Sequence, residues 1–342
     1  MMPKFVRFAA CAVVVGGSAG QVWGEASPAA MTSAISQPFS NQRYKDLSGV
    51  NQPGADFSGA YMFGANLSWS VFKAGKFQAA NLSYAKLEWA DFDEADLSQT
   101  SFEDATMFRS TFRKANLRMA NLSRSNLTNS DLTEADLLTA TLNDADLSDA
   151  KLNDAILRDA DLTGANLSGS RLRNANMQGA ILARANLQGS DFTNANLAGS
   201  ILRSAVFTST YINQANFRKA DLSGADFRDT VIDAATFQGA NLRKVDFSGA
   251  IFRNVIFTGA ILCGAIMPDG EIVKCAGEEA APTEETKPPE QAKPPEDKVS
   301  SATPKNRNTT FSGETPRAVG RSAGKPDTSI GKQGTPAGRP YI

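Results

Sequence analysis

Histidine is absent from all 342 residues of the chain. The protein therefore has no histidine general base, no Ser-His-Asp or Cys-His nucleophile pair, and no zinc site with histidine ligands. A glycine-rich phosphate loop is missing as well, because each G-x-G-like stretch lies inside a short repeat. Carboxylates are abundant, so a carboxylate pair by itself does not identify a catalytic site. The composition predicts a protein that is not an enzyme and has no catalytic residue, cofactor or metal site.

Long apolar runs are also scarce, and the one that stands out lies at the N-terminus. Lys4 and Arg7 form a short basic region, and residues 8–20 form an apolar segment too short to span a membrane. This pattern is typical of a secretory signal peptide, to which we assign residues 1–24. An uncleaved N-terminal anchor is the alternative. We expect a mature protein that is periplasmic or secreted, in a bacterium.

Cysteine is rare, and only Cys263 and Cys275 remain once the signal peptide is removed. They flank a Pro-Asp-Gly stretch at residues 268–270, which is typical of a turn and would carry the chain back on itself. An extracytoplasmic compartment favours oxidation. We therefore predict a Cys263–Cys275 disulfide, with free thiols as the alternative, and assign residues 268–277 to a C-terminal cap.

Aromatic residues are nearly absent from residues 278–342, where only Phe311 and Tyr341 occur and K-P-P-E appears twice. Such a segment does not bury enough apolar surface to offset its ordering entropy, so we predict a disordered, Pro-rich tail. Residues 278–297 carry seven acids and two lysines, and residues 298–342 carry eight basic residues and two acids. A solvated tail is the simpler interpretation, and contact of its basic half with an anionic envelope polymer is the alternative.

A five-residue repeat occupies the rest of the chain, from residue 55 to residue 267. It begins A-D-F-S-G, A-Y-M-F-G, A-N-L-S-W and continues without an insertion. Every fifth position from Phe57 onward, 43 positions in all, is Leu, Phe, Met or Ile. Ala or another small residue stands two places before each of them. An internal repeat of this length determines the architecture.

A period of five is incompatible with both common regular structures. On an α-helix, at about 100° per residue, successive apolar residues would advance by roughly 140° and form no common face. In a continuous strand, an odd period would send successive apolar residues to opposite faces. The remaining solution is a chain that turns a corner once per repeat. Four corners close a coil of about twenty residues, and stacked coils pair as parallel strands at about 4.8 Å spacing.

The pattern A-[D/N]-L-x-x resembles the pentapeptide-repeat family, and the resemblance covers about 213 of the 342 residues. It implies an all-β fold, a right-handed quadrilateral parallel β-helix (solenoid). The residue before each central position is often Asp or Asn, such as Asp56, and it is expected to point outward and hydrogen-bond the turn. Gly at the last position, such as Gly59, suits a corner with positive φ.

Residues 25–54 lie between the signal peptide and this repeat and are rich in Ser, Pro and Gln. A stack of coils exposes the strand edges of its first coil, and an uncovered edge invites aggregation. We assign part of the segment to an N-terminal cap, with a flexible linker as the alternative.

Side chains twenty residues apart are expected to form outward columns. Opposite charges alternate in several columns: Asp56–Lys76–Asp96, Glu94–Lys114–Glu134, Asp104–Arg124–Asp144, Asp93–Arg113 and Asp131–Lys151. Lys151–Arg171 is an exception. Trp69 and Trp89 share another column, and we predict that they stack. A possible partner surface comprises Trp69, Trp89, Tyr84 and Phe63; structural stacking, or burial under the N-terminal cap, is the alternative interpretation.

With its interior filled by Leu and Phe, the rod would carry any function on its outer faces, its ends or its tail. We expect a non-enzymatic scaffold or protein-binding rod whose partner is an unknown protein or a cell-envelope polymer, with no small-molecule substrate. The alternative is a DNA mimic that inhibits a topoisomerase-type enzyme, as quinolone-resistance members of the resembling family do. Nucleic acid is an unlikely partner because the repeat carries 23 acids and 20 basic residues. Ice binding would require a regular Thr array, and the outward Thr residues are scattered. The sequence leaves the oligomeric state open.

Overall fold

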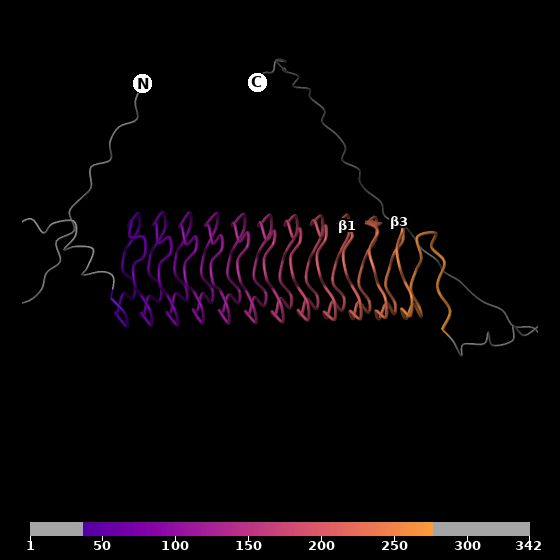
Figure 1. The fold of residues 1–342 in the computed structure, drawn as a ribbon, viewed down its shortest axis with the longest axis horizontal. Coiled ribbons are helices and arrows are strands. Elements are labelled where there is room, and N and C mark those ends of the chain that lie inside the picture. The colour runs from indigo at the N-terminus through magenta and orange to yellow at the C-terminus, as the bar shows by residue number, and fades with distance from the viewer. Residues whose placement is uncertain (1–36, 276–342) are drawn as a thin grey trace, which may run out of the picture. The chain divides into compact units, whose positions relative to one another are not determined.

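The structure is a computed structural model that describes residues 37–275, and these residues form one continuous stack of four-sided coils (Figure 1). Nearly every side of a coil pairs, parallel, with the residue twenty places later, from Asn41 with Tyr61 to Asp246 with Ile266. The twenty-residue period that the sequence predicts is therefore confirmed. No helix occurs among the described residues, and so none of them forms a helix that could cross a membrane.

Each corner is closed by hydrogen bonds that the five-residue pattern supplies. In the repeat around Phe57, the N–H of Ala60 donates to the Phe57 carbonyl at 2.9 Å. The N–H of Ser58 donates to the Asp56 carboxylate at 3.0 Å, which is the role expected for the outward Asp or Asn. The last position of the repeat has positive φ both where it is glycine, as at Gly59 (63°), and where it is not, as at Trp69 (63°). The sequence predicts the corner but not that other residues would adopt this strained conformation so often.

The interior contains the two apolar positions of each repeat. Central residues such as Leu162 and small residues such as Ala160 have no exposed surface. Several serines at the small position donate to a backbone carbonyl, as Ser125 does to the Leu122 carbonyl at 2.7 Å, whereas the buried hydroxyls of Ser130 and Ser170 have no partner among the described residues. Buried aromatic rings stack on the rings one coil away, since Phe207 and Phe227 have centroids 4.3 Å apart. The predicted inward set is confirmed.

The stack begins earlier than the sequence indicates. Residues 37–54 form the first coil and pair with the next one, so the boundary placed at residue 55 is one coil too late. The period is hard to see there because Gln42 and Gln52 flank the inward Leu47 at positions where Leu or Phe would be expected. Both glutamine side chains are buried. The segment covers the apolar core with polar side chains and so acts as the N-terminal cap.

Three sides near the C-terminal end are longer strands. They are β1 (Tyr211–Asn213), β2 (Val231–Asp233) and β3 (Ile251–Arg253), which form a parallel sheet in the order β1-β2-β3 (Figure 1). Their central residues include the β-branched Ile212 and Ile232, and bulky residues precede them. β-branched and aromatic side chains favour extended backbone. Composition therefore explains why pairing extends over three residues here.

At the C-terminal end the chain turns back over one side of the last coil. Ile272 pairs antiparallel with Ile266, and the N–H of Gly264 donates to the Val273 carbonyl at 2.8 Å. The structure joins Cys263 and Cys275 by a disulfide, with Cα atoms 4.6 Å apart. The signal peptide assigned to residues 1–24 and the tail assigned to 278–342 lie outside the described residues.

Four ion pairs between neighbouring coils fall in the columns that the sequence predicts, and other pairs, such as Arg173–Asp191 and Arg203–Asp221, join residues eighteen apart. The four column pairs, given by their charged atoms, are Arg113–Asp93 (2.5 Å), Arg124–Asp104 (2.8 Å), Lys151–Asp131 (3.2 Å) and Lys114–Glu134 (3.6 Å). Glu94 is an exception because it pairs with Lys73 at 3.1 Å and not with Lys114. Lys73 belongs to the preceding coil and comes from the neighbouring position of the same corner. Each exposed pair contributes little to the free energy of unfolding, because water and salt screen its charges.

Leu162→Lys tests the inward assignment. The substitution places an unpaired charge in the closed interior, and we expect it to lower the free energy of unfolding by about 3 kcal/mol or more. Ser168→Lys, on the outside of a corner, is the matched control and should cost under about 0.5 kcal/mol. Thermal unfolding followed by circular dichroism measures both. Equal shifts for the two variants would refute the assignment.

Loss of the disulfide is expected to loosen the C-terminal turn locally. On the chain-entropy description, a loop closed over a sequence separation of 12 contributes about 3 kcal/mol. In Cys275→Ser, hydrogen exchange at the amides of Gly264 and Val273, which bond across the turn, should therefore accelerate markedly. Exchange at Leu162 serves as the internal control and should not change. Unaltered protection at Gly264 would show that packing alone holds the turn.

Candidate functional site

Exposed and half-buried aromatic side chains gather at two adjacent corners of the N-terminal coils. We call the first corner's group the Tyr ridge and the second corner's group the Trp ridge. The Tyr ridge consists of Tyr44, Tyr61, Phe63 and Tyr84, and the Trp ridge consists of Trp69, Trp89 and Phe108. One side of the coil separates them, which is about 10 Å of extended chain.

The Trp ridge is a stack along the rod axis. The rings of Trp69 and Trp89 are nearly parallel, at 7°, with centroids 5.0 Å apart, so the predicted stacking is confirmed. The Arg109 guanidinium lies 4.9 Å from the Trp89 ring and 5.0 Å from the Phe108 ring. The column continues toward the N-terminus with Gly49, which has no side chain to cover Trp69. Trp69 is accordingly 63% exposed and Trp89 41% exposed.

Rings of the Tyr ridge meet in three ways: Tyr44 edge to face with Phe63, Tyr61 stacked on it and Tyr84 tilted against it. Phe63 is the centre, 5.7 Å from Tyr44, 6.2 Å from Tyr61 and 5.1 Å from Tyr84 between ring centroids. The Arg43 guanidinium lies 4.8 Å from the Tyr44 ring and 5.4 Å from the Phe63 ring. Interaction with the Asp104 carboxylate raises the pKa of the Tyr84 phenol, first by hydrogen bonding and then by its negative charge. Tyr84 therefore stays protonated well above neutral pH.

A polar strip borders the Trp ridge. The Glu88 carboxylate accepts hydrogen bonds from the Ser68 hydroxyl at 2.6 Å and from the Thr106 hydroxyl at 2.7 Å. Partial burial raises the pKa of Glu88, but these two hydrogen bonds together with the nearby Lys86 charge outweigh it, and the pKa lies below its ordinary value. The strip is thus fixed in position and negatively charged at neutral pH.

The four residues assigned to a partner surface therefore form two contacting pairs, Phe63 with Tyr84 and Trp69 with Trp89, on neighbouring corners. Arg43 and Arg109 also belong to the site, and neither is predicted from the sequence. Arg109 follows Trp89 by twenty residues, so the column rule that paired the tryptophans would also have found it. Arg43 directly precedes Tyr44 and lies in the coil whose period was hidden by glutamine.

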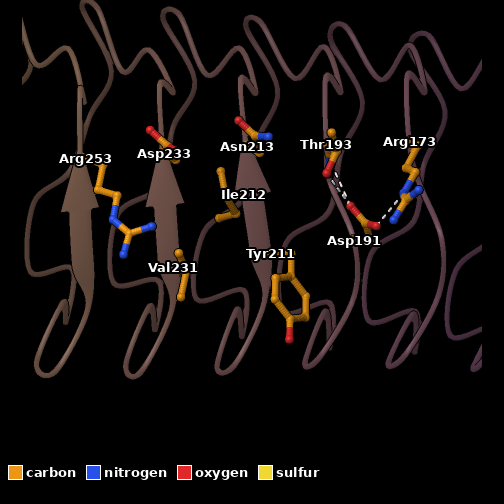
Figure 2. Close-up of a pocket in the computed structure, with 9 residues that line it drawn as sticks. All are labelled: Arg173, Asp191, Thr193, Tyr211, Ile212, Asn213, Val231, Asp233 and Arg253. Atoms are coloured by element: carbon orange, nitrogen blue, oxygen red, sulfur yellow. Dashed lines mark hydrogen bonds and ion pairs between the residues drawn. The ribbon is translucent and has the colours of Figure 1, made fainter.

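A shallow groove of about 340 Å³ lies on a different side, over the β1–β3 sheet. Figure 2 shows Asn213, Asp233 and Arg253 in a row along the sheet, and Tyr211 and Val231 in a second row. At the far end Asp191 accepts hydrogen bonds from Arg173 and Thr193, each at 2.6 Å. Partial burial raises the pKa of Asp191, but these bonds lower it further, to below its ordinary value. Among residues 37–275, no group of three His, Cys, Asp or Glu side chains is placed to hold a metal ion.

Comparison with models of known protein families finds that one family matches most of the described residues. The family model described as pentapeptide repeats matches the chain in eight stretches, and these matches span residues 46–74, 76–109, 105–143, 120–159, 140–179, 160–199, 190–229 and 232–267. A search of curated protein sequences finds no match.

Solved structures of similar proteins are also found. HetL, a pentapeptide repeat protein involved in heterocyst differentiation regulation in Nostoc sp. strain PCC 7120, is 28% identical, with 73% of this chain and 100% of HetL covered and a TM-score of 0.45. A pentapeptide repeat protein from the thylakoid lumen of Arabidopsis thaliana is 34% identical over 30% of this chain and 68% of that one, with a TM-score of 0.23. QnrB1, a plasmid-mediated fluoroquinolone resistance protein, is 17% identical over 62% of this chain and 91% of its own, with a TM-score of 0.25.

Proposed function

The chain belongs to the pentapeptide-repeat family, whose members fold as right-handed quadrilateral β-helices, and on this premise we propose that it is a non-enzymatic protein-binding rod of the bacterial cell envelope. The observation that carries the proposal is the pair of aromatic ridges at the N-terminal coils. Binding hot spots of protein interfaces are enriched in Trp, Tyr and Arg, the residue types that lie together here.

The ridges are rigid because each ring packs on another ring or under a guanidinium. Trp69 rests on Trp89, and Arg109 covers both Trp89 and Phe108. A surface that is already ordered loses little side-chain entropy when a partner binds. Preorganised aromatic residues with a polar border are therefore suited to a protein partner.

The same stacking favours a protein over an envelope polysaccharide. Sugar rings pack on open aromatic faces, and the Trp ridge presents mostly ring edges because its members cover one another. The face of Trp69 toward Gly49 is the exception. Ring edges and the cations Arg43 and Arg109 suit apolar and acidic side chains of a protein.

Charge supports this function over the DNA-mimic alternative. The repeat carries 23 acids and 20 basic residues, and its columns mix the two signs in ion pairs such as Arg113–Asp93 and Arg124–Asp104. A duplex mimic needs a continuous negative surface like that of a phosphate backbone. The signal-like N-terminus and the Cys263–Cys275 disulfide support a location outside the cytoplasm, where DNA enzymes do not occur.

The double variant Trp69→Ala/Trp89→Ala tests the proposal. Partners captured from a cell-envelope extract by the mature protein should bind this variant at least about tenfold more weakly, the loss expected for hot-spot residues. Tyr211→Ala is the matched control, because Tyr211 is as exposed as Trp69, at 63%, and lies outside the ridges. Its partner affinity should equal that of the wild type. Equal capture by all three proteins would refute the ridges as the binding site.

A further inference from the structure

The last coil differs from every other coil in its outward residues. Its four outward pairing positions are Ile251, Ile256, Ile261 and Ile266, whereas those of the preceding coil are Val231, Thr236, Asn241 and Asp246. The first three isoleucines are 50%, 51% and 41% exposed. Phe252, Phe257 and Leu262, which would be fully buried in an inner coil, are only partly buried. The end of the stack thus presents an apolar surface.

Backbone groups at this end also lack partners within the described residues. In inner coils the central N–H donates to the next coil, as Leu242 does to the Ile261 carbonyl at 2.8 Å. The corresponding N–H groups of Phe257 and Leu262 make no such bond, and β3 pairs with β2 alone. An apolar edge with open donors and acceptors is a template for a further strand.

The returning segment limits what can occupy this edge. Residues 271–273 lie one layer beyond the last coil, on the side of Ile266. A second rod meeting this end flat, coil against coil, would collide with that layer. A single strand beside β3, on another side of the coil, would lie within the same layer as residues 271–273.

The two ends of the rod are also poorly suited to bind each other in a head-to-tail assembly of two copies. Stacking head to tail would place the buried Gln42 and Gln52 of one copy over the Phe252 end of another. Residues 276–342 of the same chain also offer no matching segment. The edge would suit two bulky apolar residues followed by an acid, as argued below, and no such sequence occurs there.

The side chains of β3 indicate which kind of segment would pair with its free edge. Ile251 offers an apolar contact outside and Phe252 one inside, while Arg253 ends the column Asn213–Asp233–Arg253 (Figure 2). Arg253 makes no ion pair among the residues that the structure describes, and charges of opposite sign follow one another in such columns. An acidic residue is the complement of Arg253.

We propose that the free edge of β3 binds one extended segment of a partner protein, two bulky apolar residues followed by Asp or Glu, as a fourth parallel strand. Following the register of β2 and β3, the segment would accept hydrogen bonds from the N–H groups of Phe252 and Asn254 and donate to the carbonyls of Ala250 and Phe252. Main-chain bonds give such pairing its affinity, and the alternate side chains give it specificity. This site is at the opposite end of the rod from the aromatic ridges.

The test uses the full chain and a labelled peptide with the sequence T-V-I-D-A, which copies residues 230–234 and thus the strand that pairs with β3 on its other edge. Fluorescence anisotropy should show tighter binding of this peptide than of T-V-I-K-A, by about two- to fivefold. Methylating the valine nitrogen, which removes one N–H donor and keeps the side chain, should weaken binding about fivefold.

Arg253→Glu should reverse the preference, so that T-V-I-K-A binds more tightly than T-V-I-D-A. Arg243→Glu, an exposed arginine in the preceding coil, is the matched control and should keep the wild-type preference. Circular dichroism confirms that both variants are folded. An unchanged preference in Arg253→Glu, or indifference to N-methylation, would overturn the proposal. Two other results would also overturn the proposal. A dimer of the rod in sedimentation that the peptide does not dissociate would assign the edge to a second copy of the chain. Tighter peptide binding after deletion of residues 276–342 would assign the edge to those residues.

Discussion

Burial of one apolar residue in every five is the constraint on which this structure depends. Because a five-residue period fits neither a helix nor a straight strand, the only way to bury every central Leu or Phe is to turn a corner in each repeat. Turning requires positive φ at the last position of the repeat, and the chain adopts it even at residues such as Trp69 and Asp104. Backbone strain at single corners is tolerated because the neighbouring coils hold each corner on both sides.

Because the repeat constrains only the inward positions, the surface residues can vary, and they differ between the two ends of the rod. Toward the N-terminus, buried Gln42 and Gln52 close the core, and aromatic residues gather on the outer corners as the Tyr and Trp ridges. Toward the C-terminus, the outward positions become isoleucine and only one side is covered, by the strand around Ile272. Specificity in such a protein comes from what is attached to the repeat and not from the repeat itself.

Much of this could be predicted from the sequence because spacing alone carries the information. The inward set, the twenty-residue columns, the Trp69–Trp89 stack and the four ion pairs between residues twenty apart follow from counting. Two features could not be predicted from the spacing. The Lys73 side chain is long enough to reach Glu94 from an adjacent column. The first coil has glutamine at two inward positions, so it does not show the apolar period. The groove over β1–β3 depends on how far β-branched residues extend the pairing, which no period reveals.

Deleting part of the middle of the rod tests the central claim, that corners fall every five residues and coils close every twenty. Removing residues 141–160 takes out one whole coil, keeps every column in line and should leave a single unfolding transition within a few degrees of the wild type, because each coil contacts only its neighbours. Removing residues 141–158 takes out nearly as much chain but breaks the five-residue period, and should lower the midpoint by about 10 °C or more. Equal midpoints for the two deletions would contradict the account.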